Sequence, residues 1–252
     1  MGKESPLHIA CRNGTPDDVR ELLLAGAEIE ARDNNHATPL HAAAVAGNEV
    51  IVQMLLAAGA DKEARTDQEA TPLHLATFGG NTTVINILLS AGADIEATMR
   101  QTANQMVTQI KALFIAASRG DAAVVQLLLD SGAEVWSRTS DGTTSRTPLS
   151  IAMEKGHEEV VKVLFSHPEV IDKIQDMIAH PESYKIQDMI AHPESSTQAP
   201  TNACLICGAR TGLRCQLCKE AAFCGRVCQK AGWKDHKKIC RGAKERRNKK
   251  HT

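Results

Sequence analysis

A block of six residues recurs at a fixed interval along the first part of the chain. It reads SPLHIA at 5–10, TPLHAA at 38–43 and TPLHLA at 71–76, so successive copies begin 33 residues apart. Looser copies, KALFIA and TPLSIA, follow at 111–116 and 147–152 after steps of 40 and 36 residues. An interval of this length indicates stacked structural repeats, because one such unit cannot bury its apolar face alone.

Each copy is followed by a second segment with apolar residues at helical spacing and a glycine after them. Four segments share this pattern: 19–29, 52–62, 85–95 and 125–135. Their glycines fall just after a helix end, where a left-handed backbone favours glycine: Gly26, Gly59, Gly92 and Gly132. A second set is predicted to end the first helices in the same way: Gly14, Gly47, Gly80, Gly120 and Gly156. Four of the first helices also have proline in their first turn, where its missing N–H costs nothing.

The composition favours helices over sheets. Hydrophobic residues make up 42% of the chain, but aromatic residues only 3%. The core must therefore be built from Ala, Leu, Val and Ile, which suits stacked short helices better than a sandwich or barrel. The repeats predict an all-α repeat solenoid made of helix pairs.

The repeats resemble the ankyrin repeat family. The resemblance rests on the Thr-Pro-Leu-His blocks and the Leu-Leu-x-x-Gly-Ala-Asp/Glu blocks, and it covers residues 3–166, about five repeats. It implies a stack of helix pairs with projecting β-turn fingers. Specificity for a partner protein would come from the concave face of such a stack.

Two departures from the family pattern affect the fingers. Where the family usually has Gly two residues before Thr, this chain has His36, Glu69 and Ser145. A residue with a Cβ in a left-handed turn costs on the order of 1 kcal/mol, so we expect reshaped fingers there. Residues 98–111 lack the finger pattern altogether. We expect an irregular loop in that segment, and the weakest junction between repeats.

Three histidines and one cysteine in the repeats are predicted to be structural. His8, His41 and His74 recur at one repeat position, so stacking spaces them along the array. Each is expected to hydrogen-bond the backbone of an adjacent turn. No set of nucleophile, base and orienting group appears among them, and there is no Gly-rich phosphate loop. Cys11 is expected to be a small, buried helix residue.

Residues 167–203 separate the repeats from a cysteine-rich segment. The sequence KIQDMIAHPES at 173–183 returns unchanged at 185–195, as part of a 12-residue tandem duplication. The apolar residues before and within the first copy fall on one helical face: Val170, Ile171, Ile174, Met177 and Ile178. We predict two or three short helices interrupted by prolines. The first would cap the open end of the repeat stack or, alternatively, dock a partner. Polar residues 195–202 form the predicted linker.

The segment 204–240 has the spacing of a metal site. Four pairs of ligand residues follow one another: Cys204 and Cys207, Cys215 and Cys218, Cys224 and Cys228, His236 and Cys240. Structural zinc takes four N or S ligands, so eight ligands fit two zinc ions and leave no position for a catalytic water. A segment this short cannot fold on a hydrophobic core alone, and metal binding worth about 10–16 kcal/mol per site would supply most of its folding free energy. The predicted fold class is therefore an all-α repeat solenoid with a small zinc-stabilised C-terminal domain.

The string F-C-x3-C-Q-x3-W-x2-H-x3-C at 223–240 resembles the MYND-type zinc finger. The family usually has Tyr at the position of Phe223. The HIT-type finger has a similar ligand order but lacks the Gln-x3-Trp element, and a RING finger would carry its His in the middle of the series.

Spacing alone leaves three ways to combine the four pairs of ligands. The MYND resemblance implies one of them. One ion would be held by Cys204, Cys207, Cys224 and Cys228. The other would be held by Cys215, Cys218, His236 and Cys240.

The MYND resemblance also implies a ligand. Members of the family bind short proline-containing peptides, and Gln229 and Trp233 match the positions associated with that groove. Trp233 would offer an apolar face to proline, and Gln229 would hydrogen-bond an extended backbone. The alternative is that Trp233 only packs the small core.

Charge is unevenly distributed along the chain. Residues 204–252 carry 14 Lys and Arg against 3 Asp and Glu, whereas the remaining residues carry 15 against 27. The basic tail 241–252 is interpreted as a solvated end, with a nuclear localisation signal or a nucleic-acid contact as alternatives. No aromatic residues interleave with its charges, so base stacking is not indicated.

The first 15 residues lack the apolar core of a signal peptide, and no apolar run approaches the ~18 residues of a membrane helix. We expect an intracellular, cytoplasmic or nuclear, non-enzymatic adaptor. The repeats would bind one protein, the zinc module would bind proline-containing peptides, and there would be no small-molecule substrate. The alternative is a nucleic-acid-associated transcriptional regulator or co-repressor that uses the basic end.

Overall fold

The fold is taken from a computed structural model of the 252-residue chain. The structure describes residues 4–103, 106–139, 146–179, 213–214 and 222–223. The chain divides into two compact units, Met1–Pro148 and Leu149–Thr252, which are described separately.

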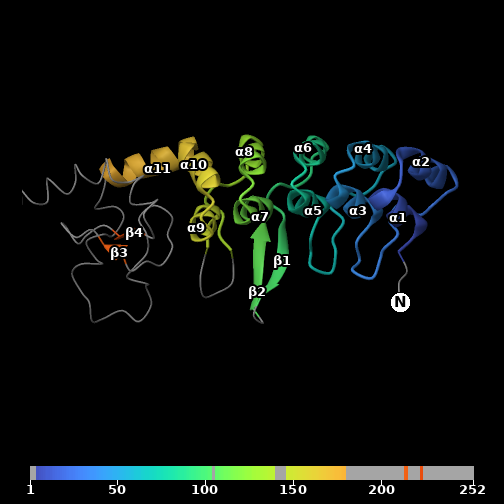
Figure 1. Ribbon diagram of the computed structural model, residues 1–252, viewed down its shortest axis with the longest axis horizontal. Helices are drawn as coiled ribbons and strands as arrows, with labels where there is room; N and C mark the ends of the chain where they lie inside the picture. The colour runs from blue at the N-terminus through green and yellow to red at the C-terminus, as the bar shows by residue number, and fades with distance from the viewer. Residues whose placement is uncertain (1–3, 104–105, 140–145, 180–212, 215–221, 224–252) are drawn as a thin grey trace, which may run out of the picture. The chain divides into compact units, whose positions relative to one another are not determined.

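The first unit is a stack of helix pairs in two layers (Figure 1). The first helices of the repeats form one layer: α1 Pro6–Asn13, α3 Pro39–Ala46, α5 Pro72–Gly79 and α7 Ala112–Arg119. The second helices form the other: α2 Pro16–Leu24, α4 Glu49–Ala57, α6 Thr82–Ser90 and α8 Ala122–Asp130. Each first helix of a repeat packs against the next, and the second helices do the same. The predicted solenoid of helix pairs is confirmed.

Local signals fix where the helices begin. Proline is in the first turn of α1, α3 and α5, as predicted, and Pro148 begins α9 (Pro148–Glu154). Thr15 caps α2 in a capping box with Asp18, whose carboxylate accepts the Thr15 N–H at 2.7 Å. The side chains of Asn48 and Asp121 cap α4 and α8 by accepting the backbone N–H groups of Ile51 and Val124. Such caps satisfy N–H groups that have no partner inside the helix.

The core consists of aliphatic residues at matched repeat positions. One column comes from the first helices, and each member is at most 2% exposed: Leu7, Leu40, Leu73 and Leu113. Another comes from the second helices and is fully buried: Leu55, Leu88 and Leu128. Full burial of one such leucine is worth about 1.5–3 kcal/mol, so the columns hold neighbouring repeats together. Cys11 is also fully buried, as predicted, and burial raises the pKa of its thiol to about 12.

The glycines after the second helices have left-handed backbones, as predicted, with φ between 80° and 91°. Those that end the first helices do so as well, except Gly14, whose φ is −87°. The predicted left-handed conformation of Gly14 is therefore wrong, although α1 does end at this glycine. A Cβ at Gly14 would lie 2.6 Å from the carbonyl oxygen of Ala10. Glycine is therefore required here because there is no room for a side chain, and not because the backbone is left-handed.

The turns at His36 and Glu69 are not reshaped, contrary to expectation. Both residues keep the left-handed conformation usual for glycine, with φ of 55° and 57°. Each uses its side chain to reach the following finger: His36 pairs with Asp67 at 2.6 Å, and Glu69 pairs with Arg100 at 3.0 Å. These pairs offset part of the backbone strain. Ser145, at the third such position, lies outside the described residues.

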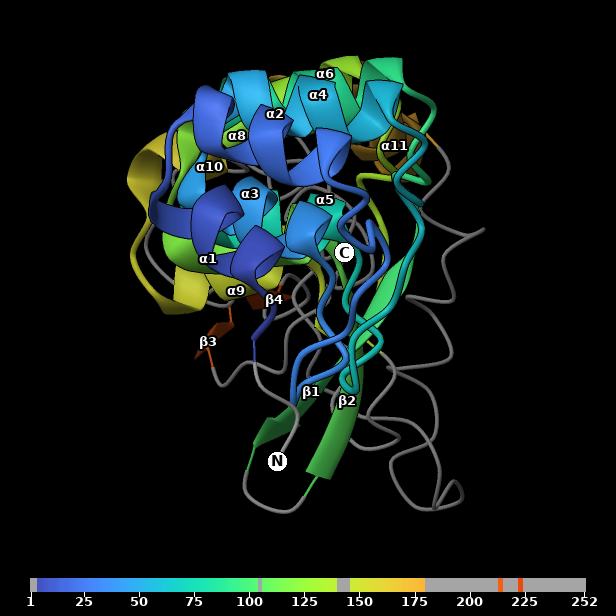
Figure 2. The ribbon, with the colours of Figure 1, turned by 90° about the vertical axis from the view of Figure 1, so that its right-hand side faces the viewer.

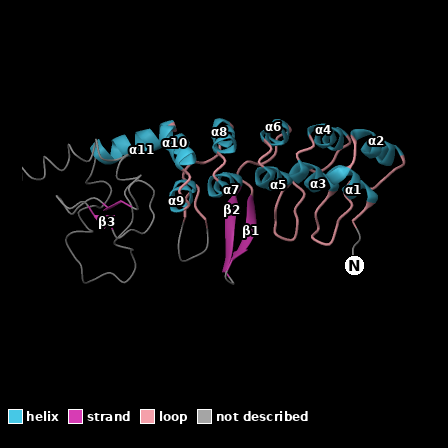
Figure 3. Ribbon diagram, in the orientation of Figure 1, coloured by secondary structure: helices cyan, strands magenta, loops and turns pink. Residues whose placement is uncertain are grey.

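The segment predicted as an irregular loop is a regular β-hairpin. Strand β1 (Thr98–Ala103) pairs antiparallel with β2 (Met106–Lys111), and Figures 2 and 3 show the hairpin projecting beyond the fingers that precede it. The paired residues Met99 and Ile110 are each 3% exposed, whereas Arg100 is exposed. This alternation has the period of a strand, which comparison with the finger pattern did not reveal.

Contacts of the hairpin tie it to its neighbours. The Arg100 N–H donates to the carbonyl oxygen of Gln68 at 2.7 Å, and Arg65 donates to the carbonyl oxygen of Thr98. Helices α5 and α7 contact each other less extensively than α3 and α5 do. That this junction is the weakest stays a prediction.

The second unit contains α9, α10 (Glu158–Ser166), α11 (Pro168–Ala179) and a short pair of strands, β3 (Leu213–Arg214) and β4 (Ala222–Phe223). A helix after the repeats was predicted, and α11 packs against α10. Val170 is 1% exposed but Ile171 is 40% exposed, so the predicted apolar face is only partly covered. Its role as a cap stays a prediction. The second copy of the duplication, the linker and the basic tail lie outside the described residues, and the predicted domain boundaries remain predictions.

Among the helices that the structure describes, none is both long and apolar enough to span a bilayer.

Candidate functional site

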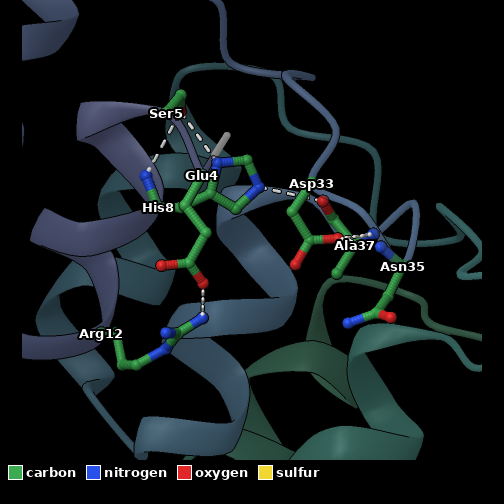
Figure 4. A network of polar contacts seen from close by, with 7 residues as sticks. All are labelled: Glu4, Ser5, His8, Arg12, Asp33, Asn35 and Ala37. Atoms are coloured by element: carbon green, nitrogen blue, oxygen red, sulfur yellow. Dashed lines mark hydrogen bonds and ion pairs between the residues drawn. The ribbon is translucent and has the colours of Figure 1, made fainter. Parts of the chain in front are cut away.

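The first histidine of the repeats connects two repeats, as Figure 4 shows. His8 Nδ1 lies 2.8 Å from the Ser5 hydroxyl at the start of α1, and Nε2 lies 2.9 Å from the carbonyl oxygen of Ala37 at the base of the next finger. The carboxylate of Asp33 braces that finger by accepting the backbone N–H groups of Asn35 and Ala37 at 2.8 and 2.9 Å.

The next two histidines repeat this contact inside the stack. His41 Nδ1 accepts the backbone N–H of Thr38 at 3.1 Å, and Nε2 faces the carbonyl oxygen of Ala70 at 3.0 Å. A carbonyl only accepts, so the ring is neutral with its proton on Nε2. His74 makes the same contacts with Thr71 and Ala97. Burial lowers the pKa of both rings to about 4. The prediction that these histidines bond the adjacent turn is confirmed.

The fourth repeat replaces this contact with an ion cluster. Lys111 and Phe114 stand where the earlier repeats have Thr and His. The Lys111 ammonium lies 2.5 Å from Glu96 and 2.9 Å from Glu134. Burial lowers the pKa of Lys111, but its hydrogen bonds to Glu96 and Glu134 outweigh this effect, so the pKa is raised. Charge therefore adds to the aliphatic packing at the junctions of the fourth repeat.

The surface of the first-helix layer is a candidate for binding. Two consecutive positions at the C-terminal end of each first helix contribute eight residues, which we call the inner face. They are Arg12 and Asn13, Val45 and Ala46, Phe78 and Gly79, Ser118 and Arg119. All are exposed or half-buried, and Val45 is 42% exposed. Because α1, α3, α5 and α7 lie side by side, residues at one repeat position form a continuous stripe across them. The stripe was not identified from the sequence, although aligning the repeats in columns would have shown it.

The predicted zinc and peptide sites lie outside the described residues. None of the eight ligands, nor Gln229 or Trp233, is described. The part of this segment that is described is the β3–β4 pair, in which Leu213 is opposite Phe223 and Arg214 is opposite Ala222. Within the described ranges no group of His, Cys, Asp and Glu has a geometry that could hold a metal ion.

Comparison with family models identifies both parts of the chain. A model described as ankyrin repeats (3 copies) matches residues 6–99 and 100–175, which is more than half of the chain. The chain belongs to the ankyrin repeat family. The expected resemblance is confirmed, and the stacked helix pairs fit an ankyrin array.

A second model, the MYND finger, matches residues 204–240. This match covers the segment with the eight predicted ligands and implies that it binds zinc. An ankyrin array joined to a MYND finger is an architecture for binding other proteins. The chemistry of the donor set, seven cysteines and one histidine, also fits zinc.

Proposed function

We propose that this chain is a non-enzymatic adaptor in which the ankyrin array binds one protein partner and the MYND finger binds proline-containing peptides. The observation that carries the proposal is the combination of a continuous helix-pair stack with a matched zinc finger. The described repeats pack against one another, and the rings of His41 and His74 are held neutral by backbone groups rather than arranged for proton transfer.

The finger is proposed to hold two zinc ions. Cys204, Cys207, Cys224 and Cys228 would bind one ion, and Cys215, Cys218, His236 and Cys240 the other. Closed tetrahedral sites of this kind would fold the segment and leave no open position for chemistry.

Zinc content tests this part of the proposal. Elemental analysis of the reduced, purified chain should give two equivalents of zinc per polypeptide. Conversion of Cys215 or Cys224 to Ser should each lower that number, and the double variant should lower it further, because the two residues belong to different sites. A single equivalent in the unsubstituted chain would contradict the two-ion assignment.

Peptide binding is tested with Trp233→Ala in the intact chain. We expect the variant to lose a defined set of proline-containing partners in a pull-down while it keeps two equivalents of zinc. Loss of zinc together with the partners would instead assign Trp233 to the core of the finger. An unchanged set of partners would remove the peptide proposal.

The alternative function is a nucleic-acid-associated regulator that uses the basic end. The excess of Lys and Arg in residues 204–252 favours it. Salt-dependent binding of duplex DNA by the intact chain, lost when basic residues of 241–252 are replaced, would support it. If the intact chain does not bind DNA, the adaptor remains the proposed function.

A further inference from the structure

The inner face of the ankyrin array has apolar residues at its centre and, at the α7 end, an arginine without an ion pair among the described residues. Val45 and Ala46 of α3 are exposed, as is Gly79 of α5, and Phe78 is half-buried. A chain with only seven aromatic residues thus places one of them on this face. Aromatic and apolar residues gathered on a surface mark binding sites more often than scattered ones do.

The two ends of the inner face differ in charge. At the α1 end, Arg12 pairs with Glu4 (Figure 4). At the α7 end, Arg119 is exposed and has no ion pair or hydrogen bond with any residue that the structure describes. No acidic residue occupies any of the eight inner-face positions. A ligand that crosses α3, α5 and α7 would therefore meet two apolar positions and then a cation.

The distance between neighbouring helices sets the distance at which a ligand must present successive side chains. Packed helices lie about 8–10 Å apart, so Val45, Phe78 and Ser118–Arg119 present their side chains at about that interval. A polyproline II segment has three residues per turn and rises about 3.1 Å per residue, so every third side chain returns to one face after about 9 Å. An extended β-segment turns alternate residues to opposite faces and has no such match.

We propose that the inner face binds a polyproline II segment of a partner protein in which two apolar residues and one carboxylate recur at every third position. The apolar side chains would lie on Val45 and Phe78, and the carboxylate would pair with Arg119. This inference rests on the proposed function and specifies the partner of the repeat array.

The probes are fluorescein-labelled peptides bound to the intact chain. The first, GLPPLPPDG, carries Leu, Leu and Asp at intervals of three. The second, GLPPPLPPPDG, spaces them at intervals of four, and the third, GLPPLPPKG, replaces Asp with Lys. Fluorescence anisotropy should give the tightest binding for the first peptide, and at least fivefold weaker binding for the other two.

Variants of the chain locate the binding surface. Val45→Asp should weaken binding of the first peptide at least tenfold. Val50→Asp is the matched control, because Val50 lies in the second-helix layer and is 50% exposed. It should change binding less than twofold. Arg119→Glu should weaken binding of the Asp peptide and strengthen binding of the Lys peptide. A merely structural role of Arg119 at the end of α7 would not reverse this preference.

Three outcomes would overturn the inference: equal binding of the first two peptides, equal effects of Val45→Asp and Val50→Asp, or a loss of both charged peptides on Arg119→Glu. Binding that disappears with Trp233→Ala but survives Val45→Asp would assign the peptide to the finger. That result would overturn this inference while supporting the proposed function. Failure of the first peptide to bind would overturn the inference alone, because the Trp233→Ala pull-down decides the adaptor function separately.

Discussion

Nε2 of His41 lies 3.0 Å from the carbonyl oxygen of Ala70, which is 29 residues further along the chain. The bond connects the first helix of one repeat to the base of the next finger. It needs a neutral ring, because Nδ1 accepts a backbone N–H on the other side. His74 is held in the same way by Thr71 and Ala97.

The first prediction is an acid-sensitive array. Burial lowers the pKa of His41 and His74 to about 4. The unfolded chain therefore takes up protons at these rings at a higher pH than the folded chain does. Their contribution to stability is complete above about pH 6.5 and is lost as the pH falls toward 4. The loss amounts to at most about 3 kcal/mol per histidine.

Urea unfolding from pH 7.5 to 4.5 measures this dependence. Carboxylates also titrate at the acid end, so the readout is the difference between the unsubstituted chain and His41→Gln. Gln lacks a titrating ring, and the variant should lose less stability between pH 6.5 and 5. Parallel curves for the two proteins would contradict the prediction.

The second prediction concerns the glycine after α3. Gly47 has φ of 77°, and a Cβ built there would lie 2.5 Å from the side chain of Asn81 in the next repeat. Gly47→Ala should therefore lower the free energy of unfolding by more than the roughly 1 kcal/mol that left-handed alanine costs. Gly59→Ala is the control, since Gly59 has φ of 91° and nothing within 4 Å of its added Cβ. Equal losses in chemical denaturation would show that Asn81 moves aside without cost.

The sequence predicted well what depends on spacing. The 33-residue interval indicated helix pairs, and the glycine and proline positions marked their ends. The pattern of His8, His41 and His74 indicated that these residues are structural. All three follow from local backbone requirements that repeat with the period.

What the sequence did not predict depends on contacts between residues far apart. The left-handed turns at His36 and Glu69 were expected to change because the cost of a Cβ is local, whereas the compensating ion pairs come from the next finger. The hairpin of β1 and β2 was missed because segment 98–111 was compared with a finger rather than tested for alternation. The eight ligands proposed at 204–240 rest on spacing, because metal coordination depends on residue type and interval, and the MYND finger model matches the same segment.

The third prediction concerns Lys111, which bridges Glu96 and Glu134 at 2.5 and 2.9 Å. Lys111→Met keeps the apolar stem but removes both ion pairs. The variant should lose about 1 kcal/mol of stability at low ionic strength, because the Lys111 side chain is only 22% exposed. The deficit should shrink in 1 M NaCl, where charges are screened within about 3 Å. Glu134→Gln, on the more exposed arm, should have a smaller effect. A deficit that is independent of salt would point to packing instead.

The fourth prediction weighs backbone strain against an ion pair at the tip of a finger. His36 has φ of 55°, a conformation that costs on the order of 1 kcal/mol for a residue with a Cβ. Its ring pairs with Asp67, but both side chains are more than half exposed, and exposed pairs contribute about 0–1 kcal/mol. His36→Gly removes both terms, so it should leave stability unchanged or raise it by a few tenths of a kcal/mol. His36→Ala removes the pair and keeps the strain, so it should be the less stable of the two variants. Thermal unfolding of the unsubstituted chain and the two variants compares the terms, because only His36→Ala keeps the strain without the pair. If His36→Gly were less stable than His36→Ala, backbone strain at position 36 would not reduce the stability of the protein.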